Sequence, residues 1–326
     1  MEHIKTLPDM LRNSVENYRD RTAYKIKEEG KFIPVTYQDL YQKIKSFGTG
    51  LHDIGVNRFD HVGLVSENRL EWIISDMAII NLRATDVPCS GNSSPRDIHS
   101  KLLHSDSNTV ILEGEKQFIN FYQVREKLPG IKNVILIEKI QLFSEKEEAP
   151  EWATSIPFEK NQQISAELEK AMLNFIKHKN MVLLLSPSAK NFLEKYLEDN
   201  KKQLLEKSNS QQSADLKKQD LSLRTIVINK KHNQNQPYHV FSYQEIFERG
   251  HKLLEKGDTR FEALSKTVRE DDLATIIYTS GTTSDPKGVM LTHANFMHNI
   301  QVAHPVQEIN LNDRFISILH TYHIFE

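Results

Sequence analysis

The sequence has 326 residues, of which 38% are hydrophobic, and this is enough for one large domain or two ordinary ones with a buried core. Its 42 lysines and arginines nearly balance its 44 aspartates and glutamates, so no basic surface indicates nucleic acid as a partner. The single cysteine, Cys89, excludes an intramolecular disulfide and a zinc site of several cysteines, and it suits a reducing compartment.

The N-terminal residues, MEHIKTLPDMLRNSVENYRD, lack the basic start and the continuous apolar stretch of a signal peptide. They predict a short amphipathic helix instead. The longest apolar runs, such as MVLLL at 181–185, fall far short of the roughly 20 residues that a transmembrane helix needs. We therefore expect a cytoplasmic protein without a transmembrane segment, and peripheral contact with the inner face of the membrane is the alternative location.

From residue 36 onward, helical and strand patterns alternate. The segment 36–55 has Thr36 as its helix N-cap and Gly55 at its end. Its apolar face consists of Leu40, Ile44, Phe47 and Leu51. Further helices are expected within 69–84, 95–106 and 115–130, and strands within 61–68, 86–90, 108–113 and 132–138. Because helices separate the strands, we predict an α/β fold with layered parallel sheets, right-handed crossovers and flanking helices.

Residues 141–236 have a different character and indicate a long insertion. Two apolar stretches, at 181–187 and 223–229, are separated by a segment rich in Lys, Glu, Gln and Ser. We expect one or two helices and a flexible segment near 207–219. The expected helix has a narrow apolar stripe of Phe192, Leu193, Tyr196 and Leu197. The charges indicate a solvated face, with a membrane-surface or partner helix as the alternative.

A strand is expected at LATII, residues 273–277, and a loop follows it in the stretch YTSGTTSDPKGVMLTH at 278–293. Five hydroxyl side chains occur within six positions, those of Thr279, Ser280, Thr282, Thr283 and Ser284. Gly281 allows a tight turn and Lys287 supplies a mobile cation, so hydroxyls and backbone N–H groups can converge on a phosphate. Lys287 precedes Gly288, which differs from a Walker A loop. A polar surface turn is the alternative reading.

The stretch 278–293 resembles the phosphate-binding signature of the adenylate-forming enzymes, the superfamily of acyl-CoA synthetases, luciferases and the adenylation domains of peptide synthetases. Ser284 stands where that signature has a glycine. The resemblance extends toward the N-terminus, where Asn68, Glu71 and Trp72 are similar to residues of the bacterial long-chain acyl-CoA synthetases.

The segment ISILHTYHIFE at the end of the sequence resembles a further family segment. His323 and Glu326 match that segment, and His320 replaces its usual proline. Two other departures are Phe59 and Arg83, which both stand where the family has glycines. The resemblance therefore covers most of the sequence outside the insertion.

The resemblance implies that residues 1–326 form an incomplete N-terminal domain of the adenylate-forming fold, in which the 141–236 insertion has no counterpart. It also implies a two-step ligation: the carboxylate of a long-chain fatty acid attacks the α-phosphate of ATP, and the thiol of coenzyme A then displaces AMP. Lys287 and His323 are the implied catalytic residues, and Thr283 is the implied contact to Mg²⁺. The implied nucleotide-binding residues are Thr279, Ser280, Gly281, Thr282, Thr283, Ser284, Lys287 and Gly288.

The adenine, ribose and C-terminal lysine motifs of the family follow the segment at which this sequence ends, Glu326. We therefore expect the N-terminal part of a long-chain acyl-CoA synthetase, without the C-terminal part and the small C-terminal domain, that forms no acyl-adenylate alone. Two alternatives stay open. One is a non-catalytic nucleotide- or partner-binding module, and the other is an acyl-AMP ligase that does not use coenzyme A.

Overall fold

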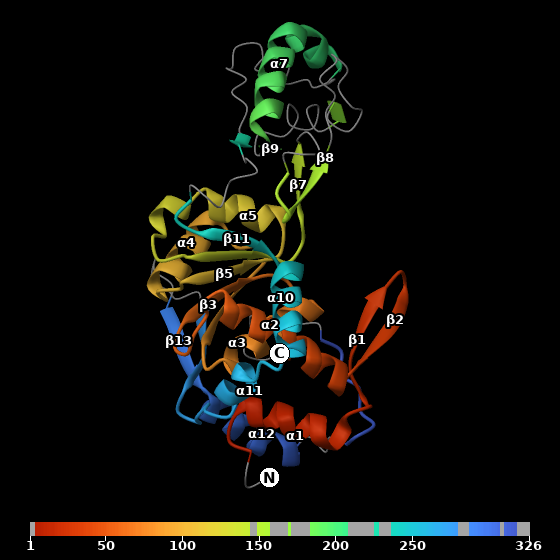
Figure 1. The fold of residues 1–326 in the computed structure, drawn as a ribbon, viewed down its shortest axis with the longest axis vertical. Helices are drawn as coiled ribbons and strands as arrows, with labels where there is room; N and C mark the ends of the chain where they lie inside the picture. Colours follow the sequence, from red (N-terminus) through yellow and green to blue (C-terminus); the bar gives the residue numbers. More distant parts are fainter. Residues whose placement is uncertain are drawn as a thin grey trace. The chain divides into compact units, whose positions relative to one another are not determined.

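The computed structural model describes residues 4–143, 149–156, 169–170, 183–207, 225–227, 236–279, 287–306 and 310–317. The chain divides into two compact units, shown as a ribbon in Figure 1: Lys139–Gln236 form the second unit and all other residues belong to the first. The range 141–236 falls within the second unit, and its status as an insertion stays a prediction.

The first unit is built on a seven-stranded sheet with the strand order β11-β6-β5-β3-β4-β12-β13. Its strands are β3 (His61–Val65), β4 (Thr85–Cys89), β5 (Thr109–Leu112), β6 (Asn133–Leu136), β11 (His239–Ser242), β12 (Leu273–Thr279) and β13 (Lys287–Thr292). Every neighbouring pair is parallel except β12 and β13, which are antiparallel. Strands β3 to β6 and β12 lie where the sequence predicts strands, and the predicted α/β fold class is confirmed.

Helices cover both faces of this sheet (Figure 1). They are α1 (Leu7–Tyr18), α2 (Tyr37–Asp53), α3 (Leu70–Asn81), α4 (Pro95–His104), α5 (Glu115–Tyr122), α10 (Tyr243–Glu255), α11 (Arg260–Ser265) and α12 (His293–Val306), with a short 3-10 helix at Arg125–Lys127. Val62 and Leu64 of β3 belong to the core that includes residues of α2, α3, α10 and α11. Gly63, between them, faces Leu102 of α4 on the opposite side of the sheet.

The predicted start of α2 is confirmed at atomic level. The hydroxyl of Thr36 accepts a hydrogen bond from the backbone N–H of Asp39 at 3.0 Å, and the Asp39 carboxylate accepts one from the Thr36 backbone in return. Such a capping box satisfies N–H groups that the first helical turn leaves without partners. The predicted apolar face is also confirmed, because 4% or less of each side chain is exposed in Leu40, Ile44, Phe47 and Leu51.

Helices α2 and α10 cross at two glycines. A Cβ atom at Gly250 would lie 1.8 Å from the backbone oxygen of Ser46, and one at Gly50 would lie 2.0 Å from the backbone oxygen of Ile246. These distances are far below van der Waals contact, so the crossing requires glycine on both helices. The close approach brings α10, which follows the second unit in sequence, against a helix from the start of the chain.

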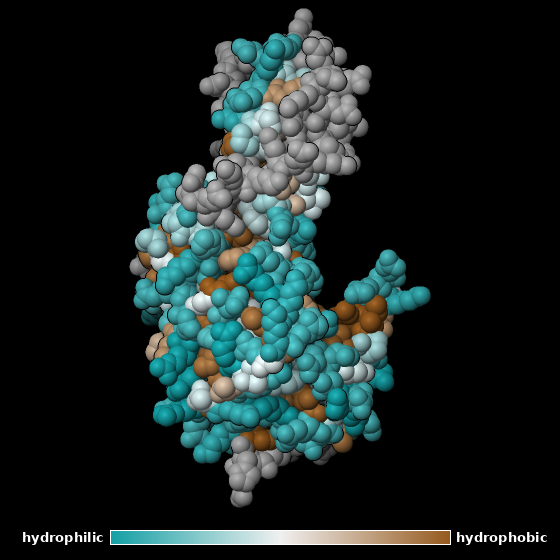
Figure 2. Space-filling view, viewed as in Figure 1, coloured by the Kyte–Doolittle hydropathy of each residue, from teal (hydrophilic) through white to brown (hydrophobic). Residues whose placement is uncertain are grey.

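An antiparallel hairpin that the sequence pattern does not predict consists of β1 (Thr22–Glu28) and β2 (Lys31–Thr36). Its turn consists of Glu29 and Gly30, with φ angles of 47° and 81°. Positive φ at both central residues is the geometry of the tight turns that join hairpin strands. Figure 2 shows apolar side chains on this hairpin, and Phe32 and Ile33 are 66% and 40% exposed.

The second unit contains a small parallel sheet with the order β10-β9-β7-β8. Its elements are β7 (Ile140–Phe143), β8 (Ala153–Ile156), β9 (Leu183–Leu185), α7 (Pro187–Lys207) and β10 (Thr225–Val227). Helix α7 confirms the helix predicted in this range, and the Leu193 side chain on it is fully buried. Apart from Lys207, the predicted flexible segment lies outside the described residues. None of the helices in the described part of the chain has the length and apolarity to span a bilayer.

The glycine crossing leads to a first prediction. In Gly250→Ala the new methyl group overlaps the backbone of α2, so we expect the free energy of unfolding to fall by about 1–3 kcal/mol or more. Gly130→Ala is the matched control, because its Cβ would meet its nearest neighbour, the oxygen of Ser107, at an ordinary 3.6 Å. Urea unfolding measures both variants, and equal stabilities would contradict the close crossing.

Candidate functional site

The candidate site lies at the end of the β12–β13 hairpin. Thr279 ends β12, Lys287 begins β13, and the two are paired across the strands. Both residues are exposed, and Gly288 pairs with Tyr278 one step further in. The structure therefore brings together the residues on either side of the predicted phosphate loop. The other predicted site residues, Ser280, Gly281, Thr282, Thr283, Ser284 and His323, lie outside the described residues.

Gly288 allows the Tyr278 ring to lie against β13. A Cβ atom at position 288 would stand 3.0 Å from Cγ2 of Ile276 and 3.3 Å from Cζ of Tyr278. The Tyr278 hydroxyl lies 2.7 Å from Nδ1 of His104 at the end of α4, and the two rings meet edge to face. Burial raises the pKa of Tyr278 to about 12, so its hydroxyl stays protonated at neutral pH. No sequence pattern indicates this contact between Tyr278 and His104.

At the other end of the hairpin, His293 connects β13 to the first helix of the chain. Its Nδ1 accepts a hydrogen bond from the backbone N–H of Leu7 at 3.3 Å, and its own backbone N–H donates to the oxygen of Asp272 at 3.2 Å. Only 1% of His293 is exposed, and burial lowers its pKa to about 4. The imidazole is therefore neutral and caps a backbone group that α1 leaves without an intrahelical partner.

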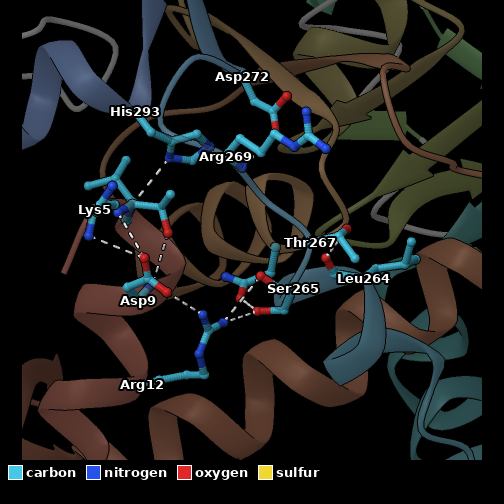
Figure 3. A network of polar contacts seen from close by, with 12 residues as sticks. Lys5, Asp9, Arg12, Leu264, Ser265, Thr267, Arg269, Asp272 and His293 are labelled. Atoms are coloured by element: carbon cyan, nitrogen blue, oxygen red, sulfur yellow. Dashed lines mark hydrogen bonds and ion pairs between the residues drawn. The ribbon is translucent and has the colours of Figure 1, made fainter. Parts of the chain in front are cut away.

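Polar contacts continue from His293 along α1 (Figure 3). Asp9 accepts hydrogen bonds from the backbone of Lys5 at 3.2 Å and from the side chain of Arg12 at 2.5 Å. Arg12 also donates to the backbone oxygen of Ser265 at 3.3 Å, and the Ser265 hydroxyl donates to Oδ1 of Asn81 at 2.7 Å. This network joins α1 to the ends of α11 and α3, and thus fixes the helix that His293 caps.

The residues on which the N-terminal resemblance depends follow strand β3. Asn68 donates to the Ser317 hydroxyl at 3.4 Å, so residue 317 lies at the carboxyl end of β3. Glu71 pairs with Arg69 at 2.9 Å, whereas Trp72 is 94% buried in the core and has a structural role. No three His, Cys, Asp or Glu side chains gather as a possible metal cage among the residues that the structure describes.

Comparison with known protein families identifies the family of this chain. The sequence profile of the AMP-binding enzymes matches residues 11–326. The chain belongs to this family. Family membership confirms the resemblance inferred from the stretch 278–293. The matched residues, 11–326, include the seven-stranded sheet and the β12–β13 hairpin.

Two plant relatives of this family member align with nearly the whole chain. The peroxisomal long chain acyl-CoA synthetase 7 of Arabidopsis thaliana is 43% identical over 99% of the chain, which covers 33% of that protein. A chloroplastic ligase of the same plant, named for joining long-chain fatty acids to acyl-carrier protein, is 26% identical over 99% of the chain and is also covered to 33%. The chain therefore spans about a third of the length of these curated relatives.

Solved structures of the AMP-binding family share the fold. A long-chain-fatty-acid-CoA ligase from Archaeoglobus fulgidus superposes with a TM-score of 0.53 at 17% identity, over 99% of this chain and 44% of that one. A protein from Rhodopseudomonas palustris, described as a long-chain-fatty-acid CoA ligase, gives a TM-score of 0.54 at 14% identity, over 99% of this chain and 53% of that one. At identities of 14% and 17%, the similarity to these structures shows a shared fold alone.

The buried His293 leads to a second prediction. Its pKa of about 4 in the folded chain is below the ordinary 6.5, so the unfolded state binds a proton first as the pH falls. The stability that the neutral ring contributes is complete above pH 6.5 and is lost between pH 6.5 and 4. In His293→Asn the amide oxygen can accept from Leu7 without titrating in this range.

Urea unfolding at several pH values measures this effect. The stability difference between the parent and His293→Asn should change by about 2 kcal/mol, in favour of the variant, between pH 6.5 and pH 5. The carboxylates titrate in both proteins, so the difference isolates the histidine. A difference that stays constant with pH would contradict the buried neutral ring.

Proposed function

We propose that this chain takes part in the ATP-dependent activation of a long-chain fatty acid, with the β12–β13 hairpin holding the phosphates of ATP. The observation that carries the proposal is the pairing of Thr279 with Lys287 across the hairpin of an AMP-binding family member. The exposed Thr279 and Lys287 flank residues 280–286 in the sequence, and the four hydroxyl residues and one glycine of that segment, together with the cation, suit a polyphosphate.

In the proposed reaction, Lys287 stabilises negative charge on the β- and γ-phosphates. The hydroxyl and backbone donors of residues 279–284 bind the same phosphates, and Thr283 contacts the Mg²⁺ that accompanies them. A carboxylate oxygen of the fatty acid attacks the α-phosphorus, an acyl-adenylate forms, and pyrophosphate leaves. Charge accumulates on the transferring and departing phosphates, so preorganised donors lower the barrier of this step.

The second step transfers the acyl group to a thiol. The sulfur attacks the acyl carbonyl carbon, a thioester forms, and AMP leaves. We propose coenzyme A as the acceptor, with His323 near the path of its pantetheine arm. Of the two plant relatives, one is named for acyl-CoA synthesis and the other for ligation to acyl-carrier protein. Parallel assays with the two acceptors therefore determine which thiol is used.

The proposal covers the location as well. We propose a cytoplasmic enzyme that contacts the membrane peripherally when it takes up its fatty acid. The Arabidopsis relatives carry the labels chloroplastic and peroxisomal, so the compartment differs among members of this family. Fractionation of the host cell with an antibody against the chain tests this part of the proposal.

A second candidate function is a nucleotide-binding module without catalysis. The chain spans about a third of the length of its curated relatives, so binding and catalysis by these 326 residues are separate proposals. Fatty-acid-dependent exchange of pyrophosphate into ATP distinguishes the two functions. Exchange by the 326-residue chain supports the enzyme, whereas ATP binding without exchange supports the module.

The phosphate role of Lys287 gives a third prediction. Removing a charged donor to a phosphate should weaken binding about tenfold, so Lys287→Ala should raise the Kd of Mg·ATP by that factor in calorimetric titration. Lys266→Ala is the matched control, because Lys266 is an exposed lysine after α11. An unchanged Kd in Lys287→Ala would exclude Lys287 from the phosphate site, and an equal loss in Lys266→Ala would show a nonspecific charge effect.

A further inference from the structure

Four non-glycine residues in the described part of the first unit have a backbone conformation that favours glycine, and two of them, Phe59 and Arg83, contact each other. Phe59 has a φ of 67° and Arg83 a φ of 60°. Side chains with a Cβ are strained in this left-handed region, and a residue as bulky as phenylalanine is rare there. Strain at two such positions persists only where surrounding contacts compensate for it.

The two strained residues contact each other directly. The backbone N–H of Phe59 donates to the oxygen of Arg83 at 2.8 Å. The Arg83 guanidinium lies 4.9 Å from the centre of the Phe59 ring, which is within the range of a cation–π contact. Phe59 is 59% exposed, and the Arg58 guanidinium also lies near its ring, 5.7 Å from the centre. The two strained residues are therefore joined by a backbone hydrogen bond and by a side-chain contact.

Arg83 also reaches the base of the β12–β13 hairpin. Its Nε and one terminal nitrogen donate to the two carboxylate oxygens of Asp272 at 2.7 and 2.9 Å. Only 13% of the Arg83 side chain and 11% of the Asp272 side chain are exposed. Burial, the largest single effect, works to raise the pKa of Asp272, but the hydrogen bonds from Arg83 and from the backbone of Arg269, together with the charge of Arg83, hold that pKa below its ordinary value. A two-point ion pair of this kind fixes orientation as well as distance.

Asp272 is the residue at which the hairpin is attached. It directly precedes β12, and its backbone oxygen accepts the N–H of His293 at 3.2 Å, just after β13. Its carboxylate also accepts the backbone N–H of Arg269 at 2.7 Å, and Figure 3 shows Asp272, Arg269 and His293 side by side. Between β12 and β4 the described pairing is a single register pair, Thr275 with Asp86. The Thr85 hydroxyl adds a hydrogen bond to the backbone oxygen of Leu273 at 3.2 Å.

We propose that Arg83 is a positioning residue for the β12–β13 hairpin: in contact with Phe59 and paired with Asp272, it fixes the base of the hairpin that carries Thr279 and Lys287. This inference rests on the proposed function. A glycine at position 83 would adopt the same backbone without strain but could form neither the ring contact nor the ion pair.

The test uses the full 326-residue chain and five variants, one of which is Arg83→Lys. Arg83→Gly removes the anchor and the strain together, Asp272→Asn removes the charge of its partner, and the double variant combines both. Arg260→Gly is the matched control, because Arg260 forms an ion pair of similar geometry with Asp258, away from the hairpin. Calorimetric titration gives the Kd of Mg·ATP, and thermal unfolding gives the midpoint temperature for each protein.

We expect Arg83→Gly and Asp272→Asn each to raise the Kd of Mg·ATP about fivefold, and the double variant to bind no more weakly than the single ones. The unfolding midpoint of Arg83→Gly should stay near that of the parent, since relief of strain offsets the lost contacts. Arg83→Lys keeps a positive charge but cannot form the two-point ion pair, so its Kd for Mg·ATP should lie between those of the parent and Arg83→Gly. Arg260→Gly should bind as the parent does.

Three results would overturn the inference. They are a parental Kd in Arg83→Gly, losses that add in the double variant, and an equal loss in Arg260→Gly. If the parent chain itself does not bind Mg·ATP, the proposed function fails, and amide hydrogen exchange decides on the anchor. Exchange in residues 287–292 should then be faster in Arg83→Gly than in the parent and Arg260→Gly, and unchanged exchange would refute the anchor.

Discussion

The hydrogen bonds of Asp272 are the constraint on which the hairpin β12–β13 depends. Its carboxylate accepts from Arg83 and from the backbone of Arg269, and its backbone oxygen accepts from His293. Every one of these donors comes from a different part of the chain: the end of α3, the segment before β12 and the start of α12. The two strands that flank the proposed phosphate loop are thus held at their base, while Thr279 and Lys287 at the other end stay exposed to solvent.

The topology of the sheet places this hairpin beside the usual ligand-binding edge of an α/β fold. The chain runs from β3 outward to β4 and then returns to β5 on the other side of β3, so the strand order reverses between β3 and β5. In open parallel sheets the crevice at such a reversal, at the carboxyl ends of the strands, is the common site for ligands. Because β12 is parallel to β4, Thr279 lies at that same edge, and so do Asn68 and its contact Ser317.

Local sequence information accounts for most elements of the first unit. The cap at Thr36 and the apolar face of α2 follow from residues within two turns of each other, and strands β3 to β6 follow from short apolar runs. The hairpin β1–β2 was missed because its turn, Glu29 and Gly30, lacks the usual asparagine or aspartate signal. Arg83 and His293 have partners 189 and 286 residues away, which no periodicity encodes. The motif at 278–293 indicates where the candidate site lies in the sequence. The residues that contact the base of its hairpin, Arg83 and His293, can be identified only from the folded structure.

The bond between Leu7 and His293 links the order of synthesis to the order of folding. Helix α1 is translated before the imidazole that caps it, which lies 286 residues further along the chain. During that interval, at roughly 5–20 residues per second, the apolar residues of α1 lack part of their final surroundings. The small cluster that contains Leu7 and Met297 forms only when both of these residues have been made. Helix α1 is therefore an early element of the nascent chain whose packing is completed late, and its apolar residues need protection until residues 293–297 emerge.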